Sequence, residues 1–169
     1  MTSVKRVVAI AVAALGLVSA QVNAQDGWQC WQEASNRYAV PIDLLYAVAR
    51  VETGNRGNII SKKNANGTYD IGLMQINSMH LPRLKRLGIT QQMLLQDPCL
   101  NLNVGASIMA ESIARHGYNW RGIGAYNAGN DTLRKIYARK VISMYDKIEK
   151  ERRSLIKMAS FSSQDGDNP

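Results

Sequence analysis

Apolar residues recur at helical spacing through most of the chain after residue 26, and polar clusters separate the periodic segments. One stripe, Leu45, Val48 and Ala49, defines the buried face of a helix that Pro41 can begin and Gly54 can end. By the same reasoning we predict helices over 27–38, 41–53, 78–87, 90–97, 101–116, 119–126 and 131–158. The pattern therefore predicts a mostly helical domain.

Three segments depart from this pattern. Residues 55–68 are rich in Gly and Asn, which is typical of a loop or short hairpin, and residues 69–77 form a compact apolar stretch. Residues 159–169 are mostly polar, and we expect them to be a disordered tail. No internal repeat is present, so residues 25–158 are predicted to form one domain, long enough to bury a core.

The N-terminal segment 1–24 has the layout of a secretory signal peptide. Lys5 and Arg6 precede an apolar run, 7–18, and a small-residue site ends at Ala24. We expect cleavage after Ala24, with Ala20 as the second choice. The run is too short for an ordinary transmembrane helix, although an uncleaved anchor is the alternative. The mature protein is thus expected outside the cytoplasm, with no stable membrane span.

Composition is ordinary for a globular protein, with 46% hydrophobic and 20% charged residues, but the net charge is +8. Signal removal would take away Lys5 and Arg6 and no acid, leaving +6. A basic exported protein attracts anionic partners, such as peptidoglycan with its peptide carboxylates, a membrane surface or nucleic acid. No groove-reading or stacking motif accompanies the charge, so nucleic acid is not expected as a partner.

The two cysteines, Cys30 and Cys99, both follow the predicted signal. An even number of cysteines in an oxidising compartment favours one disulfide, which would stabilise the fold by about 4 kcal/mol in the chain-entropy model. The two histidines, His80 and His116, have no other His or Cys nearby at ligand spacing, so we expect neither a metal nor another cofactor.

Glu52 is the candidate catalytic residue. It continues the stripe of Leu45 and Val48, where a glutamate is out of place, and it lies in the last turn of the helix. Burial and the negative end of the helix dipole both raise a carboxyl pKa, and a protonated carboxyl suits cleavage of a glycosidic bond. The alternative is a structural glutamate paired with Arg50 or Arg56.

Two later segments offer binding chemistry. In 72–77, Gly72 permits close backbone approach, Met74 offers an adaptable apolar wall, and Gln75 and Asn77 supply amides for sugar hydroxyl and acetamido groups. In Ala125-Tyr126-Asn127-Ala128-Gly129, Tyr126 can pack on a sugar or hydrogen-bond the catalytic acid. Either segment alone could equally be an ordinary turn or a core helix end.

Together and in this order, these residues resemble the soluble lytic transglycosylase family. The matching segments are Glu52-Thr53, Gly72-Leu73-Met74-Gln75 and 125–129, and the likeness spans most of the chain after residue 29. Thr53 replaces the usual serine and keeps its hydroxyl, which would support Glu52. The resemblance implies that Thr53 and Asn127, the latter in the third segment, also bind substrate. The chain is most similar to the small specialised members that accompany type III and type IV secretion, conjugation and pilus machines.

The resemblance implies a lysozyme-like, mostly helical α+β fold and a location in the periplasm of a Gram-negative bacterium. It also implies cleavage of the β-1,4 bond between N-acetylmuramic acid and N-acetylglucosamine in peptidoglycan. Glu52 would protonate the leaving oxygen, the substrate's N-acetyl group would assist, and Glu52 would then take a proton from the muramyl 6-hydroxyl. The expected product is a 1,6-anhydro sugar, formed without cofactor or metal.

Asp70 leaves the reaction open. The segment 70–78 also resembles animal-type lysozymes, which place a second carboxylate there, and two carboxylates about 5 Å apart suit a retaining hydrolase. Asp70 could instead be a turn residue bonded to its own backbone. Three hypotheses therefore remain: a transglycosylase, a hydrolase using Glu52 and Asp70, and an inactive scaffold that binds glycan or recruits secretion components.

Overall fold

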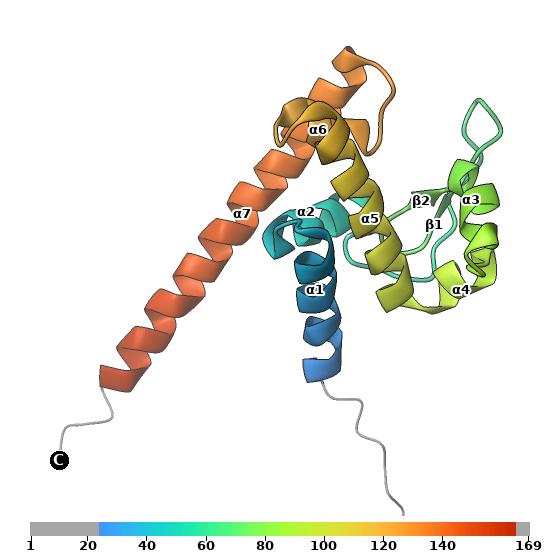
Figure 1. The fold of residues 1–169 in the computed structure, drawn as a ribbon. Helices are drawn as coiled ribbons and strands as arrows, with labels where there is room; N and C mark the ends of the chain where they lie inside the picture. Colours follow the sequence, from blue (N-terminus) through green and yellow to red (C-terminus); the bar gives the residue numbers. More distant parts are fainter. Residues whose placement is uncertain (1–23, 165–169) are drawn as a thin grey trace, which may run out of the picture.

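The computed structural model describes residues 24–164 and shows a mostly helical α+β domain, which confirms the predicted fold class (Figure 1). The helices are α1 (Ala24–Tyr38), α2 (Ile42–Thr53), the 3-10 turn η1 (Ser78–His80), α3 (Leu81–Arg86), α4 (Gln91–Gln96), α5 (Pro98–His116), α6 (Trp120–Ala125) and α7 (Asp131–Gln164). The strands are β1 (Asp70–Ile71) and β2 (Ile76–Asn77). Each predicted helix is present, although several bounds differ.

The helix α5 runs through the middle of the domain and packs against α1, α4 and α6, while α7 packs on α2 and α6 (Figure 1). It begins at Pro98, earlier than predicted. The reason is local: the Asp97 side chain accepts a hydrogen bond from the backbone N–H of Leu100, and proline fits the first turn of a helix. Leu102, Ala106 and Met109 then lie in the core.

The small hairpin β1–β2 lies beside the N-terminal half of α5. Its strands are antiparallel and pair Asp70 with Asn77 and Ile71 with Ile76, while Ile60 bridges to the outer side of Ile71. Because Ile71 and Ile76 are fully buried, the opposite residues Asp70 and Asn77 face away from the core. The pairing therefore places a carboxylate and an amide side by side.

A disulfide joins Cys30 in α1 to Cys99 at the start of α5, with Cα atoms 5.8 Å apart, which confirms the predicted pair. It closes a chain separation of 69 residues, within which lie α2, the hairpin and α3. The bond therefore encloses the segment that carries Glu52 and Asp70.

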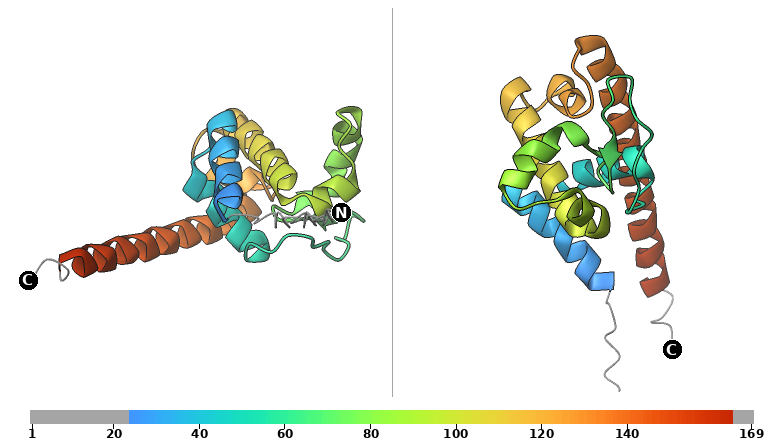
Figure 2. Two further views of the ribbon diagram at one scale, coloured as in Figure 1. Left: turned by 90° about the horizontal axis from the view of Figure 1, so that it is seen from below. Right: turned by 90° about the vertical axis from the view of Figure 1, so that its right-hand side faces the viewer.

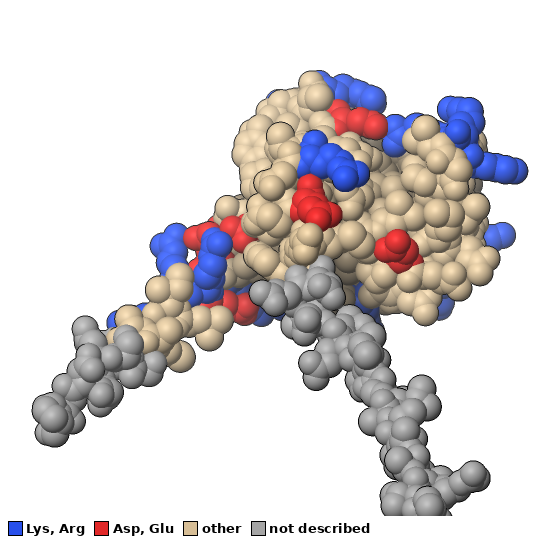
Figure 3. Space-filling view, turned by 60° about the horizontal axis from the view of Figure 1, so that its bottom comes forward, with Lys and Arg blue, Asp and Glu red and all other residues tan. Residues whose placement is uncertain are grey.

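The helix α7 extends well beyond the part of it that packs against the rest of the domain. It continues to Gln164, where we expected a disordered tail from residue 159, and its far half projects from the domain (Figure 2). Between residues 131 and 160 of α7, Ile148 is the last buried residue, and Arg152 then pairs with Asp43 of α2. Charges of both signs lie together where α7 leaves the domain (Figure 3).

Residues 165–169, the rest of the predicted tail, and residues 1–23, almost all of the predicted signal peptide, lie outside the described residues. Within 24–164, no helix combines the length and the apolar character needed to cross a membrane.

Candidate active site

Glu52 lies in the last turn of α2, half-buried, with the fully buried Leu45 and Val48 behind it on the same face. Tyr137 of α7 donates a hydrogen bond of 2.5 Å from its Oη to Glu52 Oε1. The pKa of Glu52 is raised to about 7, chiefly by burial and further by the negative charge of Asp70, against lowering effects of Tyr137 and Lys140. The carboxyl can therefore hold or release a proton near neutral pH.

The end of α2 is fixed by backbone geometry and by Thr53. Gly54 closes the helix in the left-handed conformation, at φ +64°, and its N–H donates to the Arg50 carbonyl. The buried hydroxyl of Thr53 lies within hydrogen-bond distance of the Ala49 carbonyl (3.2 Å) and the Leu73 carbonyl (3.0 Å). Thr53 thus ties α2 to the hairpin turn and supports Glu52 from behind, instead of facing a ligand.

The structural alternative for Glu52 required an arginine partner. Arg56 instead donates to the Thr53 carbonyl, and Arg50 lies over the Tyr46 ring, 6.0 Å from its centroid. Among the described residues, Glu52 forms no ion pair. The carboxyl instead accepts a hydrogen bond from Tyr137, which is neutral, so no ion pair with a described residue holds Glu52 in its ionised form.

Asp70 is held by side chains of the preceding loop and the opposite strand. Asn77 Nδ2 donates to Asp70 Oδ1 at 2.7 Å, and Ser61 Oγ and Asn64 Nδ2 donate to Oδ2 at 3.4 and 3.3 Å. The Ser61 hydroxyl also accepts the backbone N–H of Asp70 across nine residues, whereas the turn alternative expected the Asp70 side chain to bond its own backbone. These donors fix the carboxylate in one orientation, close enough to Glu52 to influence its pKa.

A cleft of about 980 Å³ runs past this pair. Asp70, Gln75, Asn77, Tyr126 and Asn127 all line it, so these five predicted residues do meet at one cavity. Glu52 lies beside Asp70 and is not among the described side chains that line the cleft. A ligand in the cleft would therefore contact Asp70 and Tyr126 directly, with Glu52 close enough to Asp70 to feel its charge.

Tyr126 was expected either to pack on a sugar or to bond the catalytic acid, and the second expectation is wrong. Its Oη donates to the Met74 carbonyl at 2.7 Å, and its ring stacks with that of Tyr137, with centroids 6.4 Å apart. Burial, followed by the charge of Glu52, raises the pKa of both tyrosines well above the usual range. Both hydroxyls therefore remain protonated donors, and Tyr137 is the one that serves Glu52.

In the segment 72–77, Gly72 and Met74 pack against the core and do not face a ligand, contrary to our expectation. Met74 is completely buried, so its side chain cannot be a wall of the cleft. Gly72 is required by packing: at φ +74°, a Cβ there would lie 2.2 Å from Asn101 Nδ2, so the close neighbour is Asn101 and not a ligand.

Gln75 and Asn77 reach the cleft with part of their amides already used. Gln75 Nε2 donates to the Gly72 carbonyl, and its backbone is left-handed, at φ +49°, an unusual conformation that recurs at functional sites. Asn77 donates to Asp70 and to Thr68 Oγ1, and it accepts the N–H of Met79. Gln75 Oε1 is therefore the freer acceptor, while Asn77 acts mainly through Asp70.

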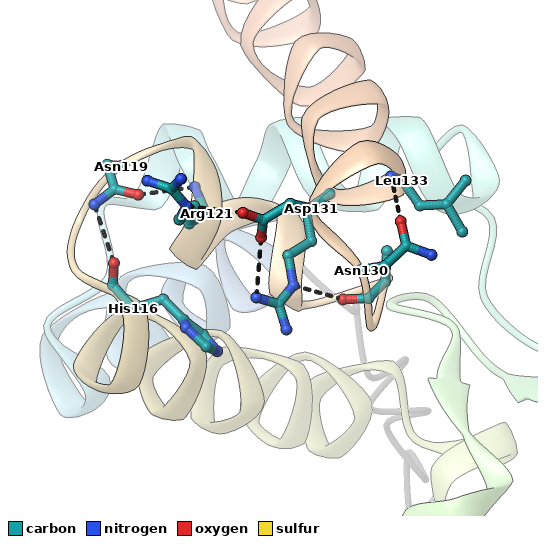
Figure 4. A network of polar contacts seen from close by, with 8 residues as sticks. His116, Asn119, Arg121, Asn130, Asp131 and Leu133 are labelled. Atoms are coloured by element: carbon teal, nitrogen blue, oxygen red, sulfur yellow. Dashed lines mark hydrogen bonds and ion pairs between the residues drawn. The ribbon is translucent and has the colours of Figure 1, made fainter.

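The segment 125–129 is held in place by a polar corner between α6 and α7 (Figure 4). Asn119 caps α6 by accepting the Arg121 N–H, and Arg121 Nε pairs with Asp131 at 3.1 Å. Arg134 Nε donates to the Ala128 carbonyl. At Gly124 a Cβ would meet the Arg134 carbonyl at 2.4 Å, so the two helices touch there and set the wall that carries Tyr126.

Two residues of the site were not identified from the sequence. Tyr137 lies on the apolar stripe of the last helix with Val141 and Ile148, and its hydroxyl tip is the one signal in the sequence that it needs a polar partner. Asn101 is fully buried, donates to the Ile71 and Leu94 carbonyls and accepts the Met74 N–H. An asparagine at the start of an apolar helix was its only trace in the sequence.

Over residues 24–164, no three His, Cys, Asp or Glu side chains gather in a way that could hold a metal ion. The site consists of a carboxyl of raised pKa, a second carboxylate held by amides, and a cleft with amide and phenol groups. A carboxyl of raised pKa beside a second carboxylate is the arrangement expected in a lysozyme-like domain.

Comparison with known proteins agrees with the family that the sequence motifs predicted. The Transglycosylase SLT domain matches residues 29–148, so the chain belongs to the SLT transglycosylase domain family, as the sequence motifs predicted. Invasion protein IagB of Salmonella typhimurium (strain SL1344) is 43% identical over 124 residues, which cover 71% of this chain and 77% of that protein. Protein IpgF of Shigella flexneri is 36% identical over 126 residues, 72% and 82% of the two chains. A putative peptidoglycan-binding-like protein of Escherichia coli K12 is 39% identical over 123 residues, 67% and 78% of the two.

Proposed function

We propose that this protein is a lytic transglycosylase that cleaves the β-1,4 bond between N-acetylmuramic acid and N-acetylglucosamine and releases 1,6-anhydromuramyl products. The observation that carries the proposal is the Glu52 carboxyl, whose pKa of about 7 lets it act as an acid and then as a base. Membership of the SLT family supports the substrate.

In the proposed reaction, a glycan strand lies in the cleft between Asp70 and Tyr126. Protonated Glu52 gives its proton to the glycosidic oxygen as the bond to the muramyl C1 breaks, and the N-acetyl group of the substrate stabilises that carbon. Ionised Glu52 then takes the proton of the muramyl 6-hydroxyl, whose oxygen bonds to C1. Tyr137 stabilises the ionised state of Glu52 between the two steps through its hydrogen bond.

A second candidate is a retaining hydrolase in which Asp70 acts on the muramyl carbon. The observation that favours it is the orientation of the Asp70 carboxylate, fixed by Asn77, Asn64 and Ser61 at the wall of the cleft. The products differ, because hydrolysis leaves a free reducing end where the transglycosylase leaves an anhydro ring.

We further propose export to the periplasm of a Gram-negative bacterium and local opening of the wall for a secretion, conjugation or pilus machine. The signal-like segment 1–24 supports export. The name of one relative, Invasion protein IagB, supports a role beside such a machine.

Digestion of purified peptidoglycan, followed by mass analysis of the products, tests the reaction. We expect anhydromuramyl products from the native protein, none from Glu52→Gln, and undiminished products from Glu33→Gln, the same change at an exposed glutamate of α1. Reducing-end products that depend on Asp70 would favour the hydrolase, and no products from the native protein would favour a scaffold.

A further inference from the structure

The cleft that Asp70 lines is also lined by residues of η1, α3 and α5. The chain passes directly from Asn77 through η1 to His80 and then to Arg83 of α3. From α5, the lining residues Ile108, Glu111, Ser112, Arg115 and His116 recur at helical spacing and so form one face toward the cleft. We call His80, Arg83, Glu111, Arg115 and His116 the far wall.

The ion pair in the far wall leaves hydrogen-bond donors unused. Arg83 contacts both oxygens of Glu111 through a single nitrogen, Nη1, at 2.6 and 2.8 Å. Its Nε and Nη2 have no hydrogen bond to another described residue. The side chains of Arg83 and Glu111 are 38% and 47% exposed, so those donors can reach a ligand. A guanidinium presents five N–H donors in a planar fork that fits a carboxylate.

Arg115 adds a second positive charge that no acid neutralises. It follows Glu111 by one turn of α5, is exposed, and makes no hydrogen bond or ion pair with any residue of the described range. Burial and the neighbouring Arg83 lower the pKa of His80, so that ring is neutral at pH 7. Two arginines against one glutamate therefore leave the far wall with a net positive charge.

We propose that the far wall is a subsite for the peptide stem of peptidoglycan, with Arg83 and Arg115 binding a stem carboxylate. This rests on the proposed function of the cleft. In the proposed function the sugar backbone would lie against Asp70, Gln75 and Tyr126, and the stem is the part of the substrate that carries carboxylates. Paired arginines recognise carboxylates through charge-assisted hydrogen bonds, and neutral sugar hydroxyls would gain less from them.

Binding measured by calorimetry in the Glu52→Gln background, which keeps the shape of the protonated acid, tests the subsite without cleavage. The two probes are a soluble muramyl tetrasaccharide with tetrapeptide stems and the same tetrasaccharide with its stems removed by an amidase. We expect Arg83→Ala and Arg115→Ala each to weaken binding of the stem-bearing probe by about three- to tenfold, the effect of a partly exposed charge pair. Binding of the stripped probe should stay unchanged.

Arg86→Ala is the matched control, because it removes the same charge from an exposed position of α3 outside the cleft. Arg115 has no hydrogen-bond or ion-pair partner among the described residues, so Arg115→Ala should keep the native melting temperature. A loss of binding in this variant therefore cannot be explained by misfolding. Equal losses on both probes, or no loss on either, would overturn the stem subsite. Stem-selective binding by a native protein that yields no anhydro products would support the subsite and overturn the proposed reaction alone.

Discussion

The Tyr137 hydroxyl donates a 2.5 Å hydrogen bond to Glu52 Oε1, and so connects α7 to the end of α2 across 85 residues of sequence. The contact favours the ionised carboxyl, while burial favours the protonated one, and burial is the larger effect. Glu52 thus keeps a pKa near 7 because two opposing influences meet there. Substitution of a neighbouring residue should therefore shift the pKa of Glu52 in the direction opposite to that residue's contribution.

The raised pKa of Glu52 should make stability depend on pH. The folded state binds this proton more tightly than the unfolded state, so its stabilising effect is complete below pH 4.5 and is lost as pH rises through about 7. Glu52→Gln removes the dependence. We expect the mutant to gain about 2 to 3 kcal/mol over the native protein between pH 4 and pH 8. Urea unfolding at both pH values measures this, and a constant difference would show that burial does not raise the pKa.

Tyr137→Phe should raise the pKa of Glu52 further, because it removes the donor that stabilises the ionised form. Cleavage in the native protein should fall as pH rises above about 7, and in the mutant this alkaline limb should move to higher pH. The rate at pH 6 should drop by about tenfold from lost positioning. A pH profile of product release measures both effects.

Tyr126→Phe is the control for that experiment. Its hydroxyl bonds the Met74 carbonyl instead of Glu52, so its loss should cost about 1 kcal/mol of stability and leave the alkaline limb in place. If both phenylalanine variants moved the limb equally, the hydrogen bond from Tyr137 would not be the cause.

Asp70→Asn should act in the opposite direction to Tyr137→Phe. The negative charge of Asp70 raises the pKa of Glu52, so its removal should shift the alkaline limb below its native position. Anhydro products should persist if Asp70 only tunes Glu52. Complete loss of turnover in a variant that melts like the native protein would instead favour the two-carboxylate hydrolase.

The sequence allowed prediction of those parts of the site that depend on neighbours along the chain. The stripe of Leu45 and Val48 predicted where Glu52 lies, and Gly54 predicted where the helix ends. Both follow from local periodicity and backbone conformation. The pairing of Cys30 with Cys99 was predictable because the chain offers only these two cysteines.

Contacts between distant segments were beyond that reasoning. Tyr137 reaches Glu52 only because α7 packs on α2, and Met74 is buried because Gly105 leaves it room. Neither contact can be predicted from residues that are close together in the sequence. For the same reason, the motif residues Gly72 and Met74 were interpreted as facing a ligand when they in fact hold the turn against α5.

Asn101 should be the residue on which the shape of the cleft most depends. It is fully buried, and its amide satisfies the Ile71 and Leu94 carbonyls and the Met74 N–H, each at 2.8 to 2.9 Å. Asn101→Ala would leave three buried backbone groups without partners, which we expect to cost about 3 to 5 kcal/mol of unfolding free energy.

The matched control for Asn101 is Asn103, on the same helix, whose amide donates within α5 to the Cys99 carbonyl. Asn103→Ala should change the unfolding free energy by less than about 1 kcal/mol. Because Asn101 fixes the turn that follows Asp70, its loss should also slow glycan cleavage in whatever fraction remains folded, whereas Asn103→Ala should not. Urea unfolding together with the specific activity of the folded fraction measures both effects. Equal costs for the two variants would mean that the turn is held by its own backbone and owes its shape to the hairpin alone.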